Sequence, residues 1–251
     1  MKKTALFLLL AVLFAAACGK SQIVIVEPTK DDPASGFFGV FERDLTSTSA
    51  VISNNELVKN LTHLQRMDAG GSHYYPLERE ALTKMIQSLS SYSYADCLLL
   101  NMSGTVIYTM YDNRLLAKHA DSFPNSLSIL FHHAKSGEPW ILDVSEFPEF
   151  IGGPKLFFSI PVRRGTEIEG VLIAAIAAPD IAAALKLREK VVDVTGIVRL
   201  SPNLDDLFTV TQGLSLAPGQ PLPKIVETAQ GKVLLSSLKY RNLTWIFVEK
   251  K

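Results

Sequence analysis

Side chains that often carry chemistry are scattered through this sequence rather than grouped in known catalytic motifs. His132 and His133 are adjacent. Neighbouring residues of a helix point about 100° apart, so the two rings would not grip one metal ion from the same side. No Cys, His or Asp cluster stands at metal-ligand spacing, and no phosphate loop, nucleophile elbow or zinc-protease motif is present. We therefore expect no metal, no cofactor and no enzymatic activity.

Cys18 has the most specific surroundings of any reactive residue in the chain. It follows three alanines at 15–17, a basic pair at 2–3 and an apolar run at 5–14. This order is typical of a secretory signal peptide, and the run is shorter than the roughly 20 residues that span a bilayer. The junction resembles the lipobox of bacterial lipoproteins, although Ala15 stands where that motif most often has leucine. The resemblance implies a signal peptide over 1–17 and lipid on Cys18; a plain secretory signal is the alternative.

Composition argues against several classes of partner. Without residues 1–17, the chain has 23 basic and 25 acidic side chains, a formal charge of −2, and no basic block. We therefore expect no nucleic-acid partner. The most apolar later stretch, 171–187, is broken by Pro179 and Asp180, so no second spanning segment is expected. With Cys18 lipidated, Cys97 has no disulfide partner, and its apolar neighbours predict a buried thiol.

The first part of the mature chain is predicted to be a tether followed by helices over 36–91. Residues 18–35 contain two prolines and a charged run and predict an extended tether. Phe38, Phe41 and Leu45 begin an apolar stripe at helical spacing that extends over 36–66. Pro76 suits the first turn of a second helix.

Residues 92–179 predict an antiparallel sheet. The run at 97–100 is continuously apolar, which is typical of a strand covered on both faces. A helix is expected after residue 126 and ends at Gly137, and the loop over 145–154 carries Phe147 and Phe150. The expected strands are 97–100, 105–111, 140–144, 156–162 and 170–178.

Residues 180–251 repeat this order on a smaller scale. A connecting helix is expected over 180–194, followed by a second lobe over 195–251. Within this lobe we expect strands at 197–200 and 207–211, a helix at 223–230, and a hairpin around 240–242. The fold class is α+β: a long N-terminal helix followed by two antiparallel sheet lobes, the second reduced.

This order of elements resembles the extracytoplasmic double Cache sensor modules, which are PAS-like folds of bacterial chemoreceptors and sensor kinases. The likeness covers the chain from about residue 36 and rests on 99–111, 143–147, Pro154, 157–162, 170–172 and 243–249. It implies that 92–179 is the membrane-distal, ligand-binding lobe. The chain departs from the family in lacking flanking transmembrane helices and a signalling domain after Val248.

In the resembled fold, the ligand lies between the distal sheet and the loop and helix that cover it. The residues that map there are Tyr108, Tyr111, Trp140, Asp143, Phe147 and Phe158. Apolar walls with a few polar groups suit a small molecule; Asp143 favours an amine, and tyrosine hydroxyls can bind a carboxylate. Core packing is the alternative for the Phe and Trp residues, and a loop cap for Asp143. Strand alternation places Tyr108 and Tyr111 on opposite faces, so at most one should face the ligand.

The leading interpretation is an extracytoplasmic small-molecule-binding protein, anchored by lipid to the inner or outer membrane of a bacterial cell. It would serve as a tethered binder or as an accessory to a signalling or transport system. The alternative is a structural or adaptor lipoprotein that docks as a homodimer, or on a membrane protein, through the helix at 38–64.

Overall fold

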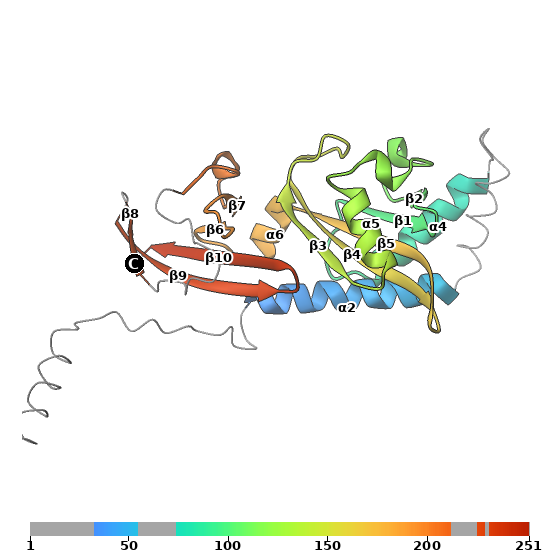
Figure 1. Ribbon diagram of the computed structural model, residues 1–251, viewed down its shortest axis with the longest axis horizontal. Coiled ribbons are helices and arrows are strands. Elements are labelled where there is room, and N and C mark those ends of the chain that lie inside the picture. The colour runs from blue at the N-terminus through green and yellow to red at the C-terminus, as the bar shows by residue number, and fades with distance from the viewer. Residues whose placement is uncertain (1–32, 55–73, 212–224, 229–230, 251) are drawn as a thin grey trace, which may run out of the picture.

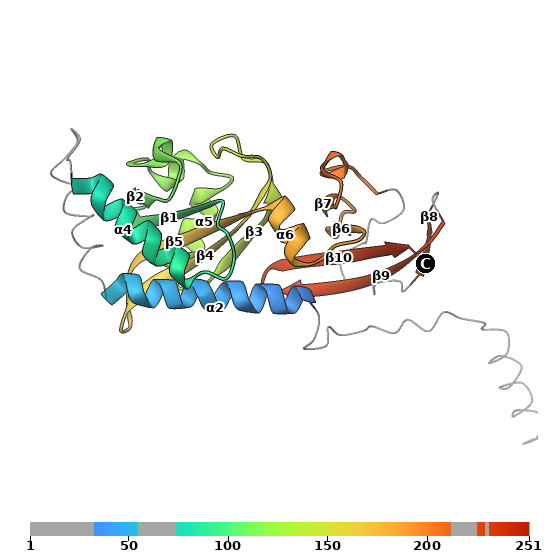
Figure 2. The same cartoon turned by 180° about the vertical axis from the view of Figure 1, so that it is seen from behind.

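The computed structural model describes residues 33–54, 74–211, 225–228 and 231–250. Two antiparallel sheets lie one after the other along the molecule (Figures 1 and 2). Helix α2 (Pro33–Asn54) runs beside the first sheet and reaches the end of the hairpin that β9 (Gly231–Tyr240) and β10 (Leu243–Lys250) form in the second, and helix α4 (Tyr74–Leu89) crosses beside the first sheet. The predicted signal peptide and Cys18 lie outside these residues. None of the described helices is long and apolar enough to cross a bilayer.

The first sheet has the strand order β2-β1-β5-β4-β3. Two 3-10 turns and helix α5 (Leu127–Lys135) connect β2 to β3. The turns are η1 (Asn113–Leu115) and η2 (Ala120–Ser122). The strands of this first sheet are β1 (Asp96–Asn101), β2 (Val106–Thr109), β3 (Trp140–Ser145), β4 (Lys155–Arg164) and β5 (Glu167–Ala177).

The second sheet repeats that order as β7-β6-β10-β9-β8. Helix α6 (Ala178–Ala184) leads into it, and the 3-10 turn η3 (Leu204–Asp206) follows β7. Its strands are β6 (Lys190–Val192), β7 (Val198–Leu200), β8 (Ile225–Thr228), β9 (Gly231–Tyr240) and β10 (Leu243–Lys250). The predicted fold class is confirmed: an α+β chain with a long N-terminal helix and two antiparallel sheets.

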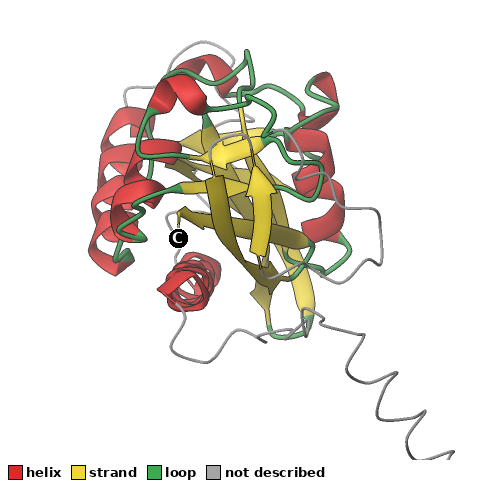
Figure 3. Cartoon of the chain, turned by 90° about the vertical axis from the view of Figure 1, so that its left-hand side faces the viewer, coloured by secondary structure: helices red, strands yellow, loops and turns green. Residues whose placement is uncertain are grey.

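Both faces of the first sheet are covered, with helices on either side of the strands in the end-on view (Figure 3). Alternation along β4 sends Phe158 toward α2, where its ring centroid lies 5.5 Å from that of Phe41. The neighbouring Phe157 points to the α5 side and lies 4.5 Å from Phe150. Cover on both faces explains the continuous apolar runs of the sequence.

Helix α2 buries its apolar stripe against this protein's own sheets. Phe38, Phe41 and Leu45 are each fully buried in a core that also contains Trp245 from the second sheet. Val51, 38% exposed, is the large apolar side chain that α2 leaves at the surface among the described residues. The described part of the helix therefore offers no apolar stripe for a docking partner. Residues 55–64 of the expected docking helix lie outside the described residues.

Several expected elements differ in the structure. Helix α2 begins at Pro33, within the expected tether, because proline fits the first helical turn. The expected helix at 223–230 is wrong, because residues 225–228 form strand β8 and pair with β9. The expected strand at 207–211 is a turn with an isolated bridge between Ile197 and Val210.

The connecting helix is also shorter than expected. Lys186 adopts a left-handed conformation with φ 51°. Its N–H donates to the carbonyl of Ala183 and the N–H of Leu187 donates to that of Ala182, both at 3.0 Å. This pair of bonds is a Schellman motif, which ends a helix. Glycine is the usual sequence signal for this kind of helix end, and here the left-handed residue is lysine. The sequence alone therefore predicts a helix that continues to residue 194, ten residues beyond the end of α6 at Ala184.

Candidate functional site

A pocket of about 450 Å3 opens between the two lobes. It lies between β3, at the edge of the first sheet, and two turns of the second lobe, the β6–β7 turn and the β9–β10 turn. Its volume is within the range of small-molecule sites. We call it the inter-lobe groove; it is lined by Ile129, Trp140, Ile141, Leu142, Asp143, Asp193, Val194, Asn242, Leu243 and Thr244.

The tip of the β9–β10 hairpin holds the outer edge of β3. The N–H of Ile141 donates to Asn242 Oδ1 at 3.0 Å, and the carbonyl of Ile141 accepts from Asn242 Nδ2 at 2.7 Å. One amide side chain therefore supplies the two bonds that another strand would make at this residue. On its other side, the hairpin tip is tied to α2, because Arg241 and Tyr240 both bond to the carboxylate of Glu42.

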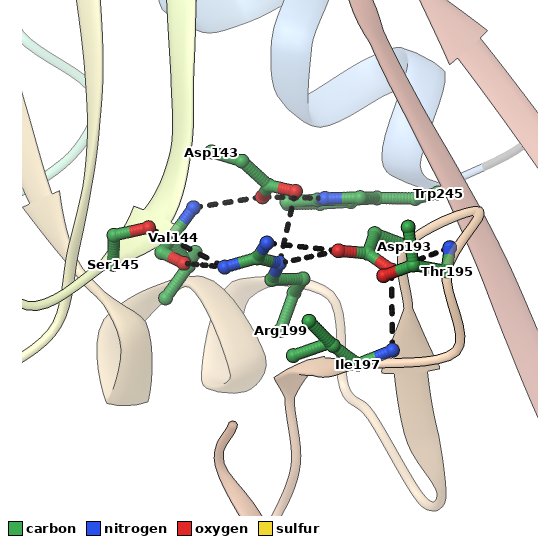
Figure 4. Close-up of polar contacts among 8 residues, drawn as sticks. All are labelled: Asp143, Val144, Ser145, Asp193, Thr195, Ile197, Arg199 and Trp245. Carbon is green, nitrogen blue, oxygen red and sulfur yellow. Dashed lines mark hydrogen bonds and ion pairs between the residues drawn. The ribbon is translucent and has the colours of Figure 1, made fainter. Parts of the chain in front are cut away.

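Asp143 receives donors from both lobes (Figure 4). Its Oδ1 accepts from the indole N–H of Trp245 at 2.9 Å and from the backbone N–H of Val144 at 2.7 Å. Its Oδ2 lies 3.5 Å from Nε of Arg199. Asp143 thus links β3 to β7 and β10.

Arg199 is directed mainly at Asp193. Its Nε and Nη2 donate to Asp193 Oδ2 at 3.0 and 2.8 Å, whereas Nη1 donates to the carbonyl of Val144 at 3.1 Å. Asp193 Oδ1 in turn accepts from the N–H groups of Thr195 at 2.8 Å and Ile197 at 3.1 Å. The carboxylate therefore shapes the β6–β7 turn and holds the guanidinium at the groove (Figure 4).

The β6–β7 turn repeats the β1–β2 turn of the first lobe. Asn101 Oδ1 accepts from the N–H groups of Ser103 and Thr105, both at 3.0 Å, as Asp193 Oδ1 does from Thr195 and Ile197. Each turn then has a glycine at positive φ, 90° at Gly104 and 84° at Gly196, which side chains rarely adopt. The second lobe has Asp193 where the first has Asn101, and the negative charge of Asp193 binds Arg199.

The two carboxylates of the groove differ in acidity. Burial raises the pKa of Asp143 to about 6, and the Trp245 hydrogen bond and the Arg199 charge offset only part of the rise. Burial also acts to raise the pKa of Asp193, but hydrogen bonds from Thr195 and Arg199 hold it below its usual value. Arg199 therefore neutralises Asp193 more fully than it neutralises Asp143.

Apolar side chains form the remaining walls. The Trp140 indole stacks on the ring of His133, with centroids 3.5 Å apart and planes 7° from parallel. Leu142 lies on the same strand, Ile129 comes from α5, and Val194, 44% exposed, comes from the β6–β7 turn. This combination of apolar walls and a few directed polar groups is typical of small-molecule sites.

Only Trp140 and Asp143 of the six predicted site residues line the groove. Tyr108 and Phe158 are fully buried on the side of α2 and α4, where the Tyr108 hydroxyl lies 2.9 Å from Thr83 Oγ1. Tyr111 is 54% exposed, and its hydroxyl accepts from Gln87. Neither tyrosine lines the groove.

Phe147 packs on the opposite face of the first sheet, within the loop that was expected to roof a hollow. Its ring lies 5.5 Å from Phe157 and 6.4 Å from Phe150. These rings, with the buried Phe131, occupy space beneath the segment where a ligand was expected. Ligand contact remains a prediction for all six residues, and the geometry supports it for Trp140 and Asp143.

The hydrogen-bonding residues that the second lobe brings to the groove were not predicted from the sequence: Asp193, Arg199, Asn242 and Trp245. A usable signal was the match between residues 101–106, Asn-Met-Ser-Gly-Thr-Val, and residues 193–198, Asp-Val-Thr-Gly-Ile-Val. This match identifies the β6–β7 turn as a counterpart of the β1–β2 turn, with Asp193 in the position of Asn101. Asn242 and Trp245 carry no comparable local pattern.

Other reactive groups have structural roles in the part of the chain that the structure describes. Cys97 is buried, and burial raises the pKa of its thiol, so the unreactive form is favoured. His132 pairs with Asp121, and His133 pairs with Glu138 and stacks on Trp140. Within the described ranges, no three His, Cys, Asp or Glu side chains are grouped to hold a metal ion.

No known family profile matches this sequence, and no curated protein is significantly similar to it. Among solved structures, the sensor domain of the Vibrio cholerae histidine kinase DctB has a TM-score of 0.58 at 15% identity, over 88% of this chain and 94% of that domain. An extracellular ligand binding receptor from Desulfohalobium retbaense has a TM-score of 0.50 at 11% identity, over 82% of this chain and 39% of that one. These similarities show that the chain has the Cache-type, PAS-like fold of sensor domains.

Proposed function

We propose that this protein is an extracytoplasmic, lipid-anchored binding protein of the sensor type, and that the inter-lobe groove holds its ligand. The ligand is a small molecule bearing an amine or a carboxylate. The observation that carries the proposal is the groove itself, where apolar walls surround the partly neutralised carboxylate of Asp143. The fold, shared with sensor domains, supports the same interpretation.

Binding without catalysis fits the residues of the groove. Its described lining contains two carboxylates, one amide and one threonine hydroxyl, and it contains no serine, cysteine or histidine. Arg199 and the indole of Trp245 hold the carboxylates in fixed positions. Such groups can orient a bound molecule through charge and hydrogen bonds.

The anchor would be lipid on Cys18 after removal of residues 1–17. Fourteen residues separate Cys18 from Pro33, the first residue of α2. Fully extended, that stretch can span at most roughly 50 Å. A tether of this reach would keep the lobes close to the membrane surface, where a signalling or transport protein could use them as an accessory subunit.

The binding proposal is tested by a thermal-shift screen of amino acids, organic acids and amines on the mature chain with Cys18→Ser. A ligand at 100 times its dissociation constant should add about 2.7 kcal/mol to the free energy of unfolding. For a chain of this size that is a rise in Tm of roughly 5–10 °C. If every class leaves Tm unchanged, small-molecule binding is rejected.

The anchor is tested separately in bacterial cells that express the full chain. Labelled palmitate should appear in the wild-type protein, and detergent should be needed to release it from membranes. Cys18→Ala should abolish both properties, whereas Cys97→Ala should not affect labelling. Equal labelling of the wild type and Cys18→Ala would refute lipidation at this site.

A further inference from the structure

We infer that the inter-lobe groove selects small organic cations, with a primary ammonium on Asp143 Oδ2 and an apolar body between Trp140, Leu142 and Val194. The inference rests on the proposed function and narrows it, because it excludes ligands whose main polar group is a carboxylate. It is carried by the charge balance of the groove, by the unequal use of the Asp143 oxygens and by the apolar walls.

The charges at the groove do not balance. Two carboxylates, Asp143 and Asp193, face one guanidinium, that of Arg199, so the three groups together carry a net charge of −1 when ionised. Arg199 is committed to Asp193 by bonds at 2.8 and 3.0 Å and lies 3.5 Å from Asp143. Asp143 is therefore the carboxylate with unmatched charge, and a second cation would pair with it.

The oxygens of Asp143 are used unequally. Oδ1 accepts from Trp245 and Val144, which fills its acceptor positions. For Oδ2, the only contact among the described residues is Arg199 Nε at 3.5 Å, beyond the range of a good hydrogen bond. The side chain is 21% exposed, so solvent and ligand can reach it. Oδ2 is thus the available acceptor of the groove.

A carboxylate ligand would find no unpaired cation in the described lining of the groove. The Nη1 group of Arg199 already donates to the Val144 carbonyl at 3.1 Å and lies 3.4 Å from Ser145 Oγ, and its other nitrogens face Asp193. Asn242 uses its amide nitrogen on Ile141. An added anion would therefore meet two carboxylates without a free guanidinium to bind it.

The body of the ligand is defined by the walls. Trp140 is held by its stack on His133, so the indole is a fixed surface for an apolar group. Leu142 and Val194 come from opposite lobes, and both line the same groove. An aromatic or branched apolar body would cover Val194, which is 44% exposed without a ligand. An amine with such a body would contact both lobes at once.

Proton uptake by Asp143 should oppose binding. Its pKa is about 6, and an ammonium binds the ionised form, so affinity should fall about tenfold per pH unit below that value. The charged groups that face Asp143 are Arg199 from β7 and Asp193 from the β6–β7 turn. The β10 neighbour Trp245 is neutral.

The test uses three probes with one phenyl body: 2-phenylethylamine, 2-phenylethanol and phenylacetate. They are titrated by calorimetry into the mature chain with Cys18→Ser. At pH 7.5, the amine should bind at least tenfold more tightly than the alcohol, and phenylacetate should not bind. At pH 5, amine binding should weaken about tenfold, while binding of the alcohol should stay constant.

Two variants locate the effect. Asp143→Asn should remove the preference for the amine over the alcohol, and the matched control Glu146→Gln, an exposed carboxylate just beyond β3, should keep it. Val194→Lys should block the amine by placing a tethered ammonium beside Asp143. Because Val194 is exposed, that variant should fold even if Asp143→Asn does not.

Each contrary result has a distinct meaning. Equal affinity for amine and alcohol would overturn charge selection, and tighter binding of phenylacetate would reverse the ligand class; the proposed function survives both. A third result is a ligand from the thermal screen that binds both variants, Asp143→Asn and Val194→Lys, as tightly as it binds the wild type. That result would show that the ligand site is not the groove, while small-molecule binding itself would stand. If no probe binds and no compound of the thermal screen raises the Tm, small-molecule binding, and with it the proposed function, is overturned.

Discussion

Asp143 is the residue whose ionisation most opposes folding of the lobe junction. Its pKa is raised by burial from 3.8 to about 6, so the folded protein holds this proton more tightly than the unfolded chain does. Because the pKa is higher in the folded state, the contribution of Asp143 to the free energy of unfolding grows as pH falls through about 6. It reaches its full value below pH 3.8, where the unfolded chain also binds the proton. Between pH 7.5 and 4.5, the wild type should therefore gain about 2 kcal/mol from this group alone.

Asp143→Asn isolates that contribution. Asparagine resembles the protonated acid, so the variant should be at least as stable as the wild type at pH 7.5 and should lose this advantage toward pH 4.5. Urea unfolding followed by circular dichroism across this range measures the difference between the two proteins. All other titrating groups are common to both, so parallel curves would show that Asp143 has an ordinary pKa.

The two related turns show how one residue change adds a contact between lobes. Asn101 and Asp193 both cap the turns that follow the first strand of their sheets, and only Asp193 carries a charge for Arg199. The sequence predicted a break between the strands at 97–100 and 105–111, but it placed Asp193 in the helix expected over 180–194. It did not predict the contact with Asp143, because the geometry of Arg199 depends on how the lobes are placed.

Replacing Asp193 with asparagine should restore the first-lobe version of the turn. The Oδ1 bonds from Thr195 and Ile197 can be kept by the amide oxygen, while Arg199 loses its stronger anionic partner. Arg199 should then pair with Asp143 and lower the pKa of that carboxyl below about 6. A shift of the stability midpoint to lower pH would support this, and an unchanged midpoint would contradict it.

At the scale of elements, the hairpin β9–β10 is the part of the second lobe that holds the edge of the first sheet. Asn242 bonds both the N–H and the carbonyl of Ile141, across 101 residues of sequence. The hairpin and its turn were predicted from their local pattern. Its contact with β3 was not, because no periodicity or turn signal relates positions so far apart.

Asn242→Ala should loosen this edge without unfolding the hairpin. Two hydrogen bonds are lost, and the freed groups of Ile141 can reach water, so the expected cost is about 1–2 kcal/mol. Amide exchange of Ile141, measured by NMR, should become faster. Asn203→Ala, which removes a cap from η3 in the same lobe, is the matched control and should leave Ile141 exchange unchanged.

Local sequence patterns predicted most helices and strands of the fold. The elements that they predicted wrongly differ for physical reasons. Helix α6 was predicted too long because it ends at Ala184 and is closed by the left-handed Lys186, where a glycine is the usual signal. The segment at 225–228 resembles a short helix but joins the edge of a sheet, where pairing with β9 overrides local propensity. Of the candidate groove, the sequence indicated Trp140 and Asp143. Its polar residues from the second lobe, such as Asp193 and Asn242, were not indicated, because no local pattern shows how the two lobes are placed.

At the scale of the whole molecule, helix α2 is a support shared by both lobes. Phe41 contacts Phe158 of the first sheet, with ring centroids 5.5 Å apart. Phe38 stacks on Tyr240 at 5.0 Å and lies 5.1 Å from Trp245, both from the second sheet. A single apolar core therefore continues through both lobes, and we expect the described fold to unfold as one cooperative unit.

Phe38→Ala tests this shared core. Removing a fully buried ring at the junction should cost about 3–5 kcal/mol and should expose Trp245 before the first sheet unfolds. Trp140 lies in the first sheet, so all proteins compared carry Trp140→Phe and Trp245 is their only tryptophan. With Phe38 present, tryptophan fluorescence and far-ultraviolet circular dichroism should give one coincident transition; in Phe38→Ala, the fluorescence transition should come first. Phe147→Ala, which removes a ring from the far face of the first sheet, should lower stability while the two signals stay coincident. Two separate transitions with Phe38 present would mean that the lobes fold independently, and that a ligand in the groove could not couple them through α2.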